Sequence, residues 1–480
     1  MESNEPRVVA AEDFASQRAA RRGKPDISNL EMCIEDARKA ALDGDAGPEA
    51  PTDYNDLRRR LDACKDKLPP LYQDVAFKPF KAALDSLGQG GFTKLLLQDP
   101  SKEGAAGLML DIAQAILQNG EGYNERATDA FQEVIADTYD GYLSAEDRQG
   151  VKPPDNEVVA PLVKWGNPEW GPYTWPVEAT ASFGVRVAIV NMPPANARRG
   201  LLAWSALEHE TAGHDILGAD DGLQPELKGA VYAALVKRNI GHGLPAYWAS
   251  RIDETASDIM GILNIGPAAG IGLIGYFRAL NAAYGGHPGL RNDGPADDPH
   301  PADIVRGYLA ASTASLLKFD GAGEWAKVIE AETEKDRTTI RLEGTVITPE
   351  EAKLSAQIVA DTVVNARMCT LENHALGEIQ NWYNHDETIA RKLRTVLTTA
   401  NQVPTRYVCG YYAAHVVAAA VTAALAKGGD VDLIFERMQT ILKVMHNSNP
   451  SWGPLYVSHP GNITARLAYV PRLAREALEE

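Results

Sequence analysis

The sequence predicts a mainly α-helical protein with a small β-sheet, an α+β fold. Apolar residues recur at three- and four-residue spacing over most of the chain, which indicates amphipathic helices. Only short stretches alternate and are rich in valine and isoleucine, as strands are. With 480 residues, 45% of them hydrophobic, the chain is long enough for two or three cores or one elaborated domain.

We expect four regions along the chain. Residues 1–55 are polar, acidic and interrupted by glycine and proline, which predicts a flexible lead-in with short helices. Residues 56–150 have helical periodicity and predict a helical N-terminal region. Residues 151–330 form the expected metal-binding region. Residues 331–480 predict a helical C-terminal region that opens with a hairpin arm and a helix start at Thr348.

The region 151–330 begins with the predicted sheet. Residues 150–176 contain three tryptophans among prolines and glycines, which excludes regular helix and predicts a linker or a loop over a pocket. Valine and isoleucine alternation predicts a strand near 183–191 at the edge of the sheet. Residues 195–217 then predict one long helix beside it. An exposed edge strand there would align an extended peptide by backbone hydrogen bonds.

Further helices are predicted at 224–239 and 246–264. They are followed by the glycine-rich stretch AAGIGLIGYF, residues 268–277. No predicted strand precedes these glycines, so a dinucleotide-binding loop is not indicated. The small residues are better explained by close packing of one helix on another.

Charge and cysteine content exclude several classes of protein. The formal net charge of −18 argues against binding to nucleic acid or to anionic membranes, because no basic stripe offsets it. The cysteines are scattered singly with no CxxC pair, which predicts a reduced, cytoplasmic setting. They are Cys33, Cys64, Cys369 and Cys409. The N-terminus lacks the apolar segment of a secretory signal.

Residues 407–426 carry no formal charge, so a membrane span has to be considered. Alanine dominates this run in place of leucine, and His415 lies at its middle. We therefore expect a buried helix of a helical domain here, with no membrane contact.

The sequence HETAGH places His209 and His214 on either side of Glu210 in a predicted helix. On an ideal helix a spacing of five residues leaves the two rings about 140° apart, too far to share one metal ion. A single-turn π-bulge would absorb the extra residue, and Gly213 makes that deformation sterically easy. The motif therefore predicts a distorted helical turn that brings two imidazoles together.

Two histidines need a third protein ligand to form a catalytic zinc site. In the downstream segment RIDETASD, Glu254 and Asp258 lie one helical turn apart on the same face. We expect Glu254 to supply the third ligand. Asp258 is then placed to accept the free ring N–H of a ligating histidine and so fix its tautomer.

HETAGH resembles the HExxGH signature of the dipeptidyl peptidase III family of zinc peptidases. DETASD resembles that family's second motif, EExxAE, with aspartate at both ends. The order of these motifs, followed by His300, Pro301 and Arg306 in HPADIVR, is similar to the wider gluzincin peptidases.

The resemblance implies one Zn²⁺ ion held by His209, His214 and Glu254, with Glu210 as the general base. It places Asp258 outside the ligand set, where it would orient a histidine ligand. It also implies a zinc-bearing helix packed beside a short sheet. The expected substrate is a peptide or a small amide.

Hydrolysis also needs a group that stabilises the oxyanion of the tetrahedral intermediate. By residue type the candidates are His300, Tyr308, Tyr411 and His415. HPAD equally fits the start of a helix with Pro301 in its first turn, and His415 equally fits a hydrogen-bonded core residue.

Two other functions remain open at this stage. Two histidines and one carboxylate also form the site of non-haem iron oxygenases, and a non-catalytic relative would keep the fold for peptide binding. Glu210 favours the peptidase, because a glutamate next to the first histidine is required for hydrolysis and is incidental in an oxygenase.

Overall fold

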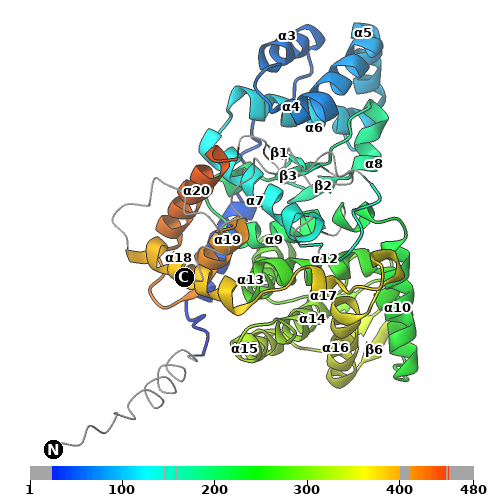
Figure 1. Cartoon of the computed structure of the whole chain (residues 1–480), viewed down its shortest axis with the longest axis vertical. Helices are drawn as coiled ribbons and strands as arrows, with labels where there is room; N and C mark the ends of the chain where they lie inside the picture. The colour runs from blue at the N-terminus through cyan, green and yellow to red at the C-terminus, as the bar shows by residue number, and fades with distance from the viewer. Residues whose placement is uncertain are drawn as a thin grey trace, which may run out of the picture.

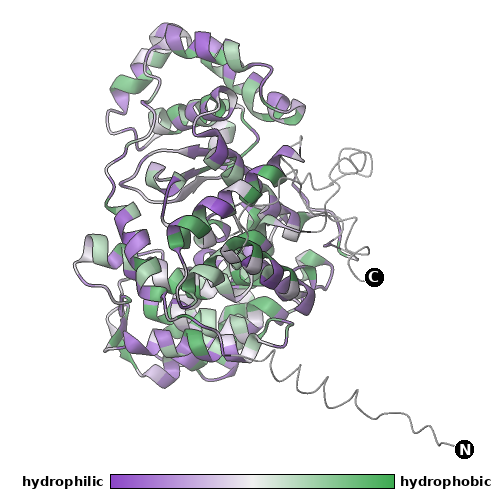
Figure 2. Ribbon diagram, turned by 90° about the vertical axis from the view of Figure 1, so that its left-hand side faces the viewer, coloured by the Kyte–Doolittle hydropathy of each residue, from purple (hydrophilic) through white to green (hydrophobic). Residues whose placement is uncertain are grey.

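The computed structural model describes residues 24–144, 147–148, 150–156, 159–212, 215–399, 411–449 and 452. It is 65% helical and contains two three-stranded sheets, which confirms the predicted α+β class (Figure 1). Figure 2 shows hydrophobic and hydrophilic residues alternating along the same helices, as expected for amphipathic helices around a core.

The helices before the first sheet, between its strands and directly after it are α2 (Leu30–Ala41), α3 (Tyr54–Cys64), α4 (Pro70–Tyr72), the π-helix η1 (Gln73–Phe77), α5 (Lys78–Gln98), α6 (Ala105–Glu121), α7 (Glu125–Leu143), α8 (Val177–Thr180) and the 3₁₀ helices η2 (Ala181–Phe183) and η3 (Pro194–Ala197). The middle helices are α9 (Leu201–Ala212), the 3₁₀ helix η4 (Ile216–Ala219), α10 (Leu223–Lys237), α11 (Leu244–Ser250), α12 (Ile252–Ile265), α13 (Pro267–Leu280), the π-helix η5 (Asn281–Gly285), α14 (Asp303–Ser315) and α15 (Ala322–Lys335). The last are α16 (Pro349–Asn365), the 3₁₀ helix η6 (Cys369–Leu371), α17 (Leu376–Ile379), α18 (Asn384–Thr399), α19 (Ala413–Leu425) and α20 (Val431–Asn447). The strands are β1 (Leu162–Trp165), β2 (Tyr173–Trp175), β3 (Ile189–Met192), β4 (Asp293–Gly294), β5 (Ile340–Leu342) and β6 (Thr345–Ile347).

The sheet of β1, β3 and β2 separates two hydrophobic cores (Figure 1). β1 runs parallel to β3, and β2 runs antiparallel to it. Because successive side chains of a strand point to opposite faces, Leu162 and Ile189 contribute to a smaller core with α3, α5 and α6. Val163 and Val190 contribute to a larger core that includes α7, α9, α12 and α13.

The strand expected near 183–191 lies elsewhere in the sheet than predicted. β3 spans residues 189–192 and is the central strand, with every residue buried. Both of its neighbours come from the segment 150–176, which we expected to be a linker or a loop. The prediction of an edge strand near 183–191 is therefore wrong, and the edge strand that packs on α9 is β2.

The two cores also cross the predicted region boundaries. Helix α2, within the expected lead-in, buries Leu30, Cys33 and Ile34 in the larger core. Helix α7, which we expected to belong with the N-terminal region 56–150, buries its apolar side chains in the same core. The boundaries at 55 and 150 therefore do not separate independent cores.

The helix predicted over 195–217 is interrupted at its start. A 3₁₀ turn covers Pro194–Ala197, and Gly200 adopts the left-handed region with φ of 79° before α9 begins. The carboxylate of Asp36 in α2 accepts from the backbone N–H groups of Gly200 and Leu201 at 2.9 and 3.1 Å. The start of α9 is thus capped by a side chain from a distant segment.

The prediction for the other end of this helix is only partly tested. The described part of α9 ends at Ala212, and the 3₁₀ helix η4 begins at Ile216. The predicted bulge at Gly213 and His214 lies outside the described residues.

Most of the other predicted elements are confirmed. Helix α10 covers the helix predicted at 224–239, and the hairpin of β5 and β6 is present. Thr348 begins α16 with a capping box to Glu351. The helix predicted at 246–264 is instead two helices, α11 and α12, which meet at Arg251.

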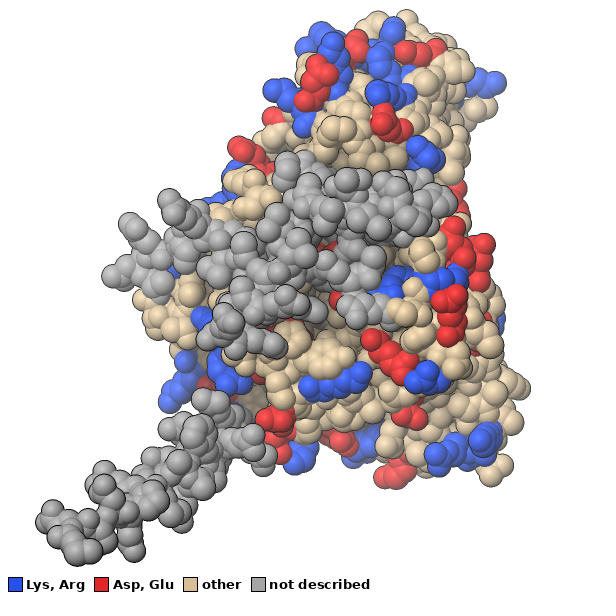
Figure 3. Space-filling model, in the orientation of Figure 1, with Lys and Arg blue, Asp and Glu red and all other residues tan. Residues whose placement is uncertain are grey.

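Helix α19 occupies most of the uncharged run 407–426 and is almost wholly buried. Within the described ranges, no helix combines the length and the apolar character needed to cross a membrane. On the face drawn in Figure 3, acidic and basic side chains are interspersed outside the grey atoms.

The glycines of α13 allow close packing on α9, as predicted. A Cβ atom at Gly272 would lie 2.1 Å from Ser205 Oγ, and one at Gly275 would lie 2.6 Å from Leu202 Cδ1. Real Cβ atoms do not approach other atoms this closely, so a Cβ at Gly272 would force the short side chain of Ser205 to move, and one at Gly275 would displace the end of the Leu202 side chain.

We expect Gly272→Ala to destabilise the protein by about 1–3 kcal/mol, because overpacking at Ser205 outweighs the roughly 1 kcal/mol of helix propensity that alanine gains. The matched control is Gly229→Ala on exposed α10, where a Cβ meets nothing within 4 Å; it should raise stability by up to about 1 kcal/mol. Urea unfolding measures both changes. Equal effects of the two substitutions would contradict the packing argument.

Candidate functional site

Three helices bring the motif residues together. Helix α9 carries His209 and Glu210, α12 carries Glu254 and Asp258, and α14 carries Arg306. Helix α9 packs against α12, and α12 packs against α14. We call His209, Glu254, Asp258 and Arg306 the ionic cluster; all four are buried.

Asp258 and Arg306 form the most buried ion pair of the cluster. Arg306 donates from Nε and from Nη2 to the two carboxylate oxygens of Asp258, at 2.7 Å each. Burial by itself raises the pKa of Asp258, but Arg306 and the hydrogen bond from His209 hold it well below its usual value. The guanidinium also lies 4.3 Å from the ring centre of Phe277. Asp258 is therefore an ionised acceptor.

Asp258 orients the ring of His209. His209 Nδ1 lies 2.9 Å from Asp258 Oδ1. Because an ionised carboxylate only accepts, Nδ1 carries the proton. Arg306 Nη2 lies 3.4 Å from the same nitrogen, but both groups are donors and Asp258 accepts from both. This is the contact that the spacing of Glu254 and Asp258 predicted.

The other ring nitrogen of His209 faces Glu254. His209 Nε2 lies 3.1 Å from Glu254 Oε2. Burial lowers the pKa of His209, but the hydrogen bonds and charges of Asp258 and Glu254 outweigh it and raise this pKa to about 10. Burial raises the pKa of Glu254, but His209 and more distant cations lower it to about 2. The pair thus creates a place where positive charge is strongly favoured.

The separation of His209 Nε2 and Glu254 Oε2 fits two ligands of one zinc ion. Ligands at about 2.0–2.1 Å in tetrahedral arrangement lie about 3.3 Å apart, close to the 3.1 Å between these atoms. The third predicted ligand, His214, lies outside the described residues. Among the residues that are described, no three histidine, cysteine or carboxylate side chains form a metal-binding group.

His300 lies beside the same glutamate. Asp298 accepts from the backbone N–H of His300 at 2.9 Å and lies 3.0 Å from its Nδ1. Arg291 in turn pairs with Asp298. The remaining ring nitrogen, Nε2, lies 3.5 Å from Glu254 Oε1. Asp298 therefore holds the half-exposed ring of His300 with Nε2 toward Glu254.

A cavity of about 270 Å³ opens next to the ionic cluster. Glu210, the residue after His209, lines it together with His300 and Arg306. The hydroxyl of Thr174 in β2 donates to the backbone carbonyl of Glu210 at 2.7 Å. The edge strand is thus fixed against the end of α9 where Glu210 lies.

Tyr308, which we expected as a candidate oxyanion donor, does not lie at this cavity. Its hydroxyl donates to Glu334 at 2.9 Å. Two residues along a helix turn the side chain by about 200°, so Tyr308 points away from the side that carries Arg306. The prediction for Tyr308 is wrong.

The other two candidates also lie apart from the residues that line the cavity. Tyr411 packs against the larger core. His415 lies 2.9 Å from Asp386 through Nε2 and accepts from the Tyr412 backbone N–H through Nδ1. His415 is therefore a hydrogen-bonded core residue, which was the alternative interpretation of the sequence.

The sequence did not reveal Tyr276, which lines the cavity from α13. Burial, and then the nearby charge of Glu210, raise its pKa, so its hydroxyl remains a proton donor. The glycines of α13 predicted close packing of this helix on another but did not identify α9 as its partner.

Comparison of the chain with protein-family models, with curated proteins and with solved structures finds no match. The resemblance to zinc peptidases therefore rests on the motif residues alone.

We expect Asp258→Asn to cost about 3–5 kcal/mol in chelator-treated protein, because it leaves Arg306 buried without its counter-charge. The exposed Asp297 provides a matched control, since Asp297→Asn should change stability by less than about 0.5 kcal/mol. Urea unfolding of both variants is the measurement. A loss below about 1 kcal/mol in Asp258→Asn would show that the cluster does not depend on this pair.

Proposed function

We propose that this protein is a zinc-dependent hydrolase of peptides or small amides. His209, His214 and Glu254 would hold one zinc ion, and Glu210 would act as general base. The observation that carries the proposal is the 3.1 Å separation of His209 Nε2 and Glu254 Oε2, with Asp258 at the other ring nitrogen. This is the donor set and tautomer that a zinc ligand of the His–Asp type requires.

Zinc bound there would supply a Lewis acid that polarises a carbonyl and makes water nucleophilic near neutral pH. Glu210 would take the proton from the attacking water and pass it to the leaving amine nitrogen. Its place beside His209 and at the wall of the cavity supports this role. The buried pair of Asp258 and Arg306 would hold the ring of His209 in position throughout.

Two side chains are candidates to stabilise the oxyanion. The Tyr276 hydroxyl is a neutral donor at the cavity. The imidazole of His300, whose Nδ1 is held by Asp298, would donate from Nε2 when protonated. Both line the cavity together with Glu210.

The edge strand β2 would align the substrate. Among the described strands its only neighbour is β3, so its other edge pairs with none of them. The contact of Thr174 with Glu210 keeps this strand next to the general base. An extended peptide that paired with β2 would place a backbone carbonyl beside Glu210.

A purely structural ion-pair network is the main competing explanation. Such a network would need neither a cavity beside it nor a glutamate on the cavity wall, and both are present. A reduced, cytoplasmic setting remains part of the proposal; the described cysteines, Cys33, Cys64 and Cys369, are free thiols.

Metal analysis of the purified chain, together with Glu210→Gln, tests the proposal. We expect zinc at one equivalent in both proteins and a loss of peptide or amide hydrolysis of about 10²–10⁴-fold in the variant, the usual contribution of a general base. Glu103→Gln, at an exposed glutamate, is the matched control and should keep full activity.

Other results would favour the remaining functions. Iron in place of zinc, with oxygen uptake, would support a non-haem oxygenase. Full function of the metal-free chain, or unchanged hydrolysis in Glu210→Gln, would exclude the proposed mechanism.

The two oxyanion candidates are separated by His300→Gln and Tyr276→Phe. The substitution that removes the true donor should lower kcat by about 10²–10³-fold with zinc content and KM little changed. A loss of zinc in His300→Gln would instead indicate that His300 helps to hold the metal.

A further inference from the structure

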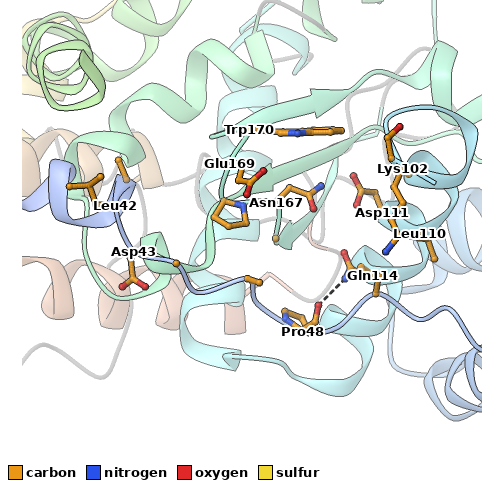
Figure 4. A pocket seen from close by; sticks show the side chains of 18 of the residues that line it. Leu42, Asp43, Pro48, Lys102, Leu110, Asp111, Gln114, Asn167, Glu169 and Trp170 are labelled. Atoms are coloured by element: carbon orange, nitrogen blue, oxygen red, sulfur yellow. Dashed lines mark hydrogen bonds between the residues drawn. The ribbon is translucent and has the colours of Figure 1, made fainter. Parts of the chain in front are cut away.

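A second cavity, of about 780 Å³, opens between helix α6, the segment 41–50 and the loop 166–170 (Figure 4). This volume is within the range of typical ligand pockets, whereas the cavity beside the ionic cluster, at about 270 Å³, is at the lower limit. The larger cavity therefore has nearly three times the volume of the smaller one.

The two cavities share one lining residue. Trp170 lines both of them. The loop continues from Gly166 at the larger cavity to Pro172 at the smaller one. On the other side, α13 lines the smaller cavity, and Tyr284, in η5 directly after α13, lines the larger one. Trp170 therefore lies where the two cavities adjoin.

The inner wall of the larger cavity is polar but carries no net charge. Asp111 lies there and is almost fully buried. Lys164 neutralises it with an ion pair of 2.9 Å. The hydroxyl of Tyr173 and the indole N–H of Trp175 donate to its other oxygen, at 2.5 and 2.8 Å. With three donors already bound to Asp111, a substrate cation would gain little here and would lie close to Lys164.

The rim of the cavity is apolar. Leu42, Trp170 and Tyr284 are 52%, 43% and 61% exposed, and all three line this one cavity. Figure 4 shows the ring of Trp170 edge-on, on the same side of the pocket as Glu169 and Asn167. Exposed large apolar side chains that converge on a pocket are typical of binding sites.

The charged groups at the mouth do not change this conclusion. Asp43 pairs with Arg198 on the surface. Glu169 and Lys102 both line the cavity, are exposed and carry opposite charges. Solvent screens such groups, so they contribute little to the choice between charged ligands.

We propose that the larger cavity is a substrate subsite that binds an uncharged aromatic or large apolar side chain of a peptide, remote from the bond that is cleaved. The inference rests on the proposed hydrolase function. It makes the substrate a peptide of several residues that lies along β2 past Trp170, and it makes Tyr284 a specificity-determining residue.

The test uses hexapeptides of alanine in which one phenylalanine, lysine or glutamate is moved through the positions, each with a free and with an acetylated N-terminus. Binding to the zinc-loaded full chain carrying Glu210→Gln is measured by calorimetry. At one end position, phenylalanine should improve Kd about tenfold over lysine and glutamate, as expected for stacking on an aromatic rim.

Substitutions at Tyr284 locate the effect. Tyr284→Ala should abolish the preference for phenylalanine. Tyr284→Phe, which keeps the ring and loses the hydrogen bond to the Ala41 carbonyl, should retain it. Tyr232→Ala, at an exposed tyrosine of α10, is the matched control and should leave binding unchanged.

No preference at any position, or a preference that survives Tyr284→Ala, would overturn the subsite. The failure of the proposed function gives a different result. If the wild-type chain cleaves none of these peptides but binds them with the Tyr284-dependent preference, the subsite is supported as a peptide site and the hydrolase is excluded.

Discussion

The arrangement of the candidate site depends on the carboxylate of Asp258. It joins α12 to α14 through Arg306 and joins α12 to α9 through His209. Because a buried charge left without its partner costs several kcal/mol, these contacts fix the rotation of all three helices about their axes. Glu254, one turn earlier on the same face of α12, then meets the free nitrogen of His209.

Strand β2 connects this site to helix α6, because its successive side chains point to opposite faces of the sheet. Tyr173 and Trp175 point to α6, where both donate to Asp111. Thr174, between them, points to α9 and donates to the carbonyl of Glu210. Three consecutive residues therefore hold the strand to both α6 and α9, which leaves it little freedom to shift in register. The position of this edge strand relative to Glu210 is set by these three side chains.

The sequence predicted features that depend on local spacing and missed those that depend on distant contacts. Helical periodicity placed Glu254 and Asp258 on one face, and the metal-site argument paired Asp258 with a histidine without specifying His209. The start of α9 could not be predicted, because its cap is Asp36 of α2. Strand β2 is only three residues long and lies among prolines and glycines, so its pattern was too short to recognise. The prediction that Tyr308 lies at the cavity was wrong because residue type does not indicate which face of α14 meets the cavity.

The glycine-rich helix α13 shows how a packing requirement shapes the site. Gly272 and Gly275 let α13 approach α9 more closely than any side chain would allow. That approach brings Tyr276 and Phe277, further along the same helix, to the wall of the smaller cavity, where Phe277 packs beneath Arg306. The helix continues into η5, which carries Tyr284 to the larger cavity. The packing of α13 on α9 therefore helps to place residues in the walls of both cavities.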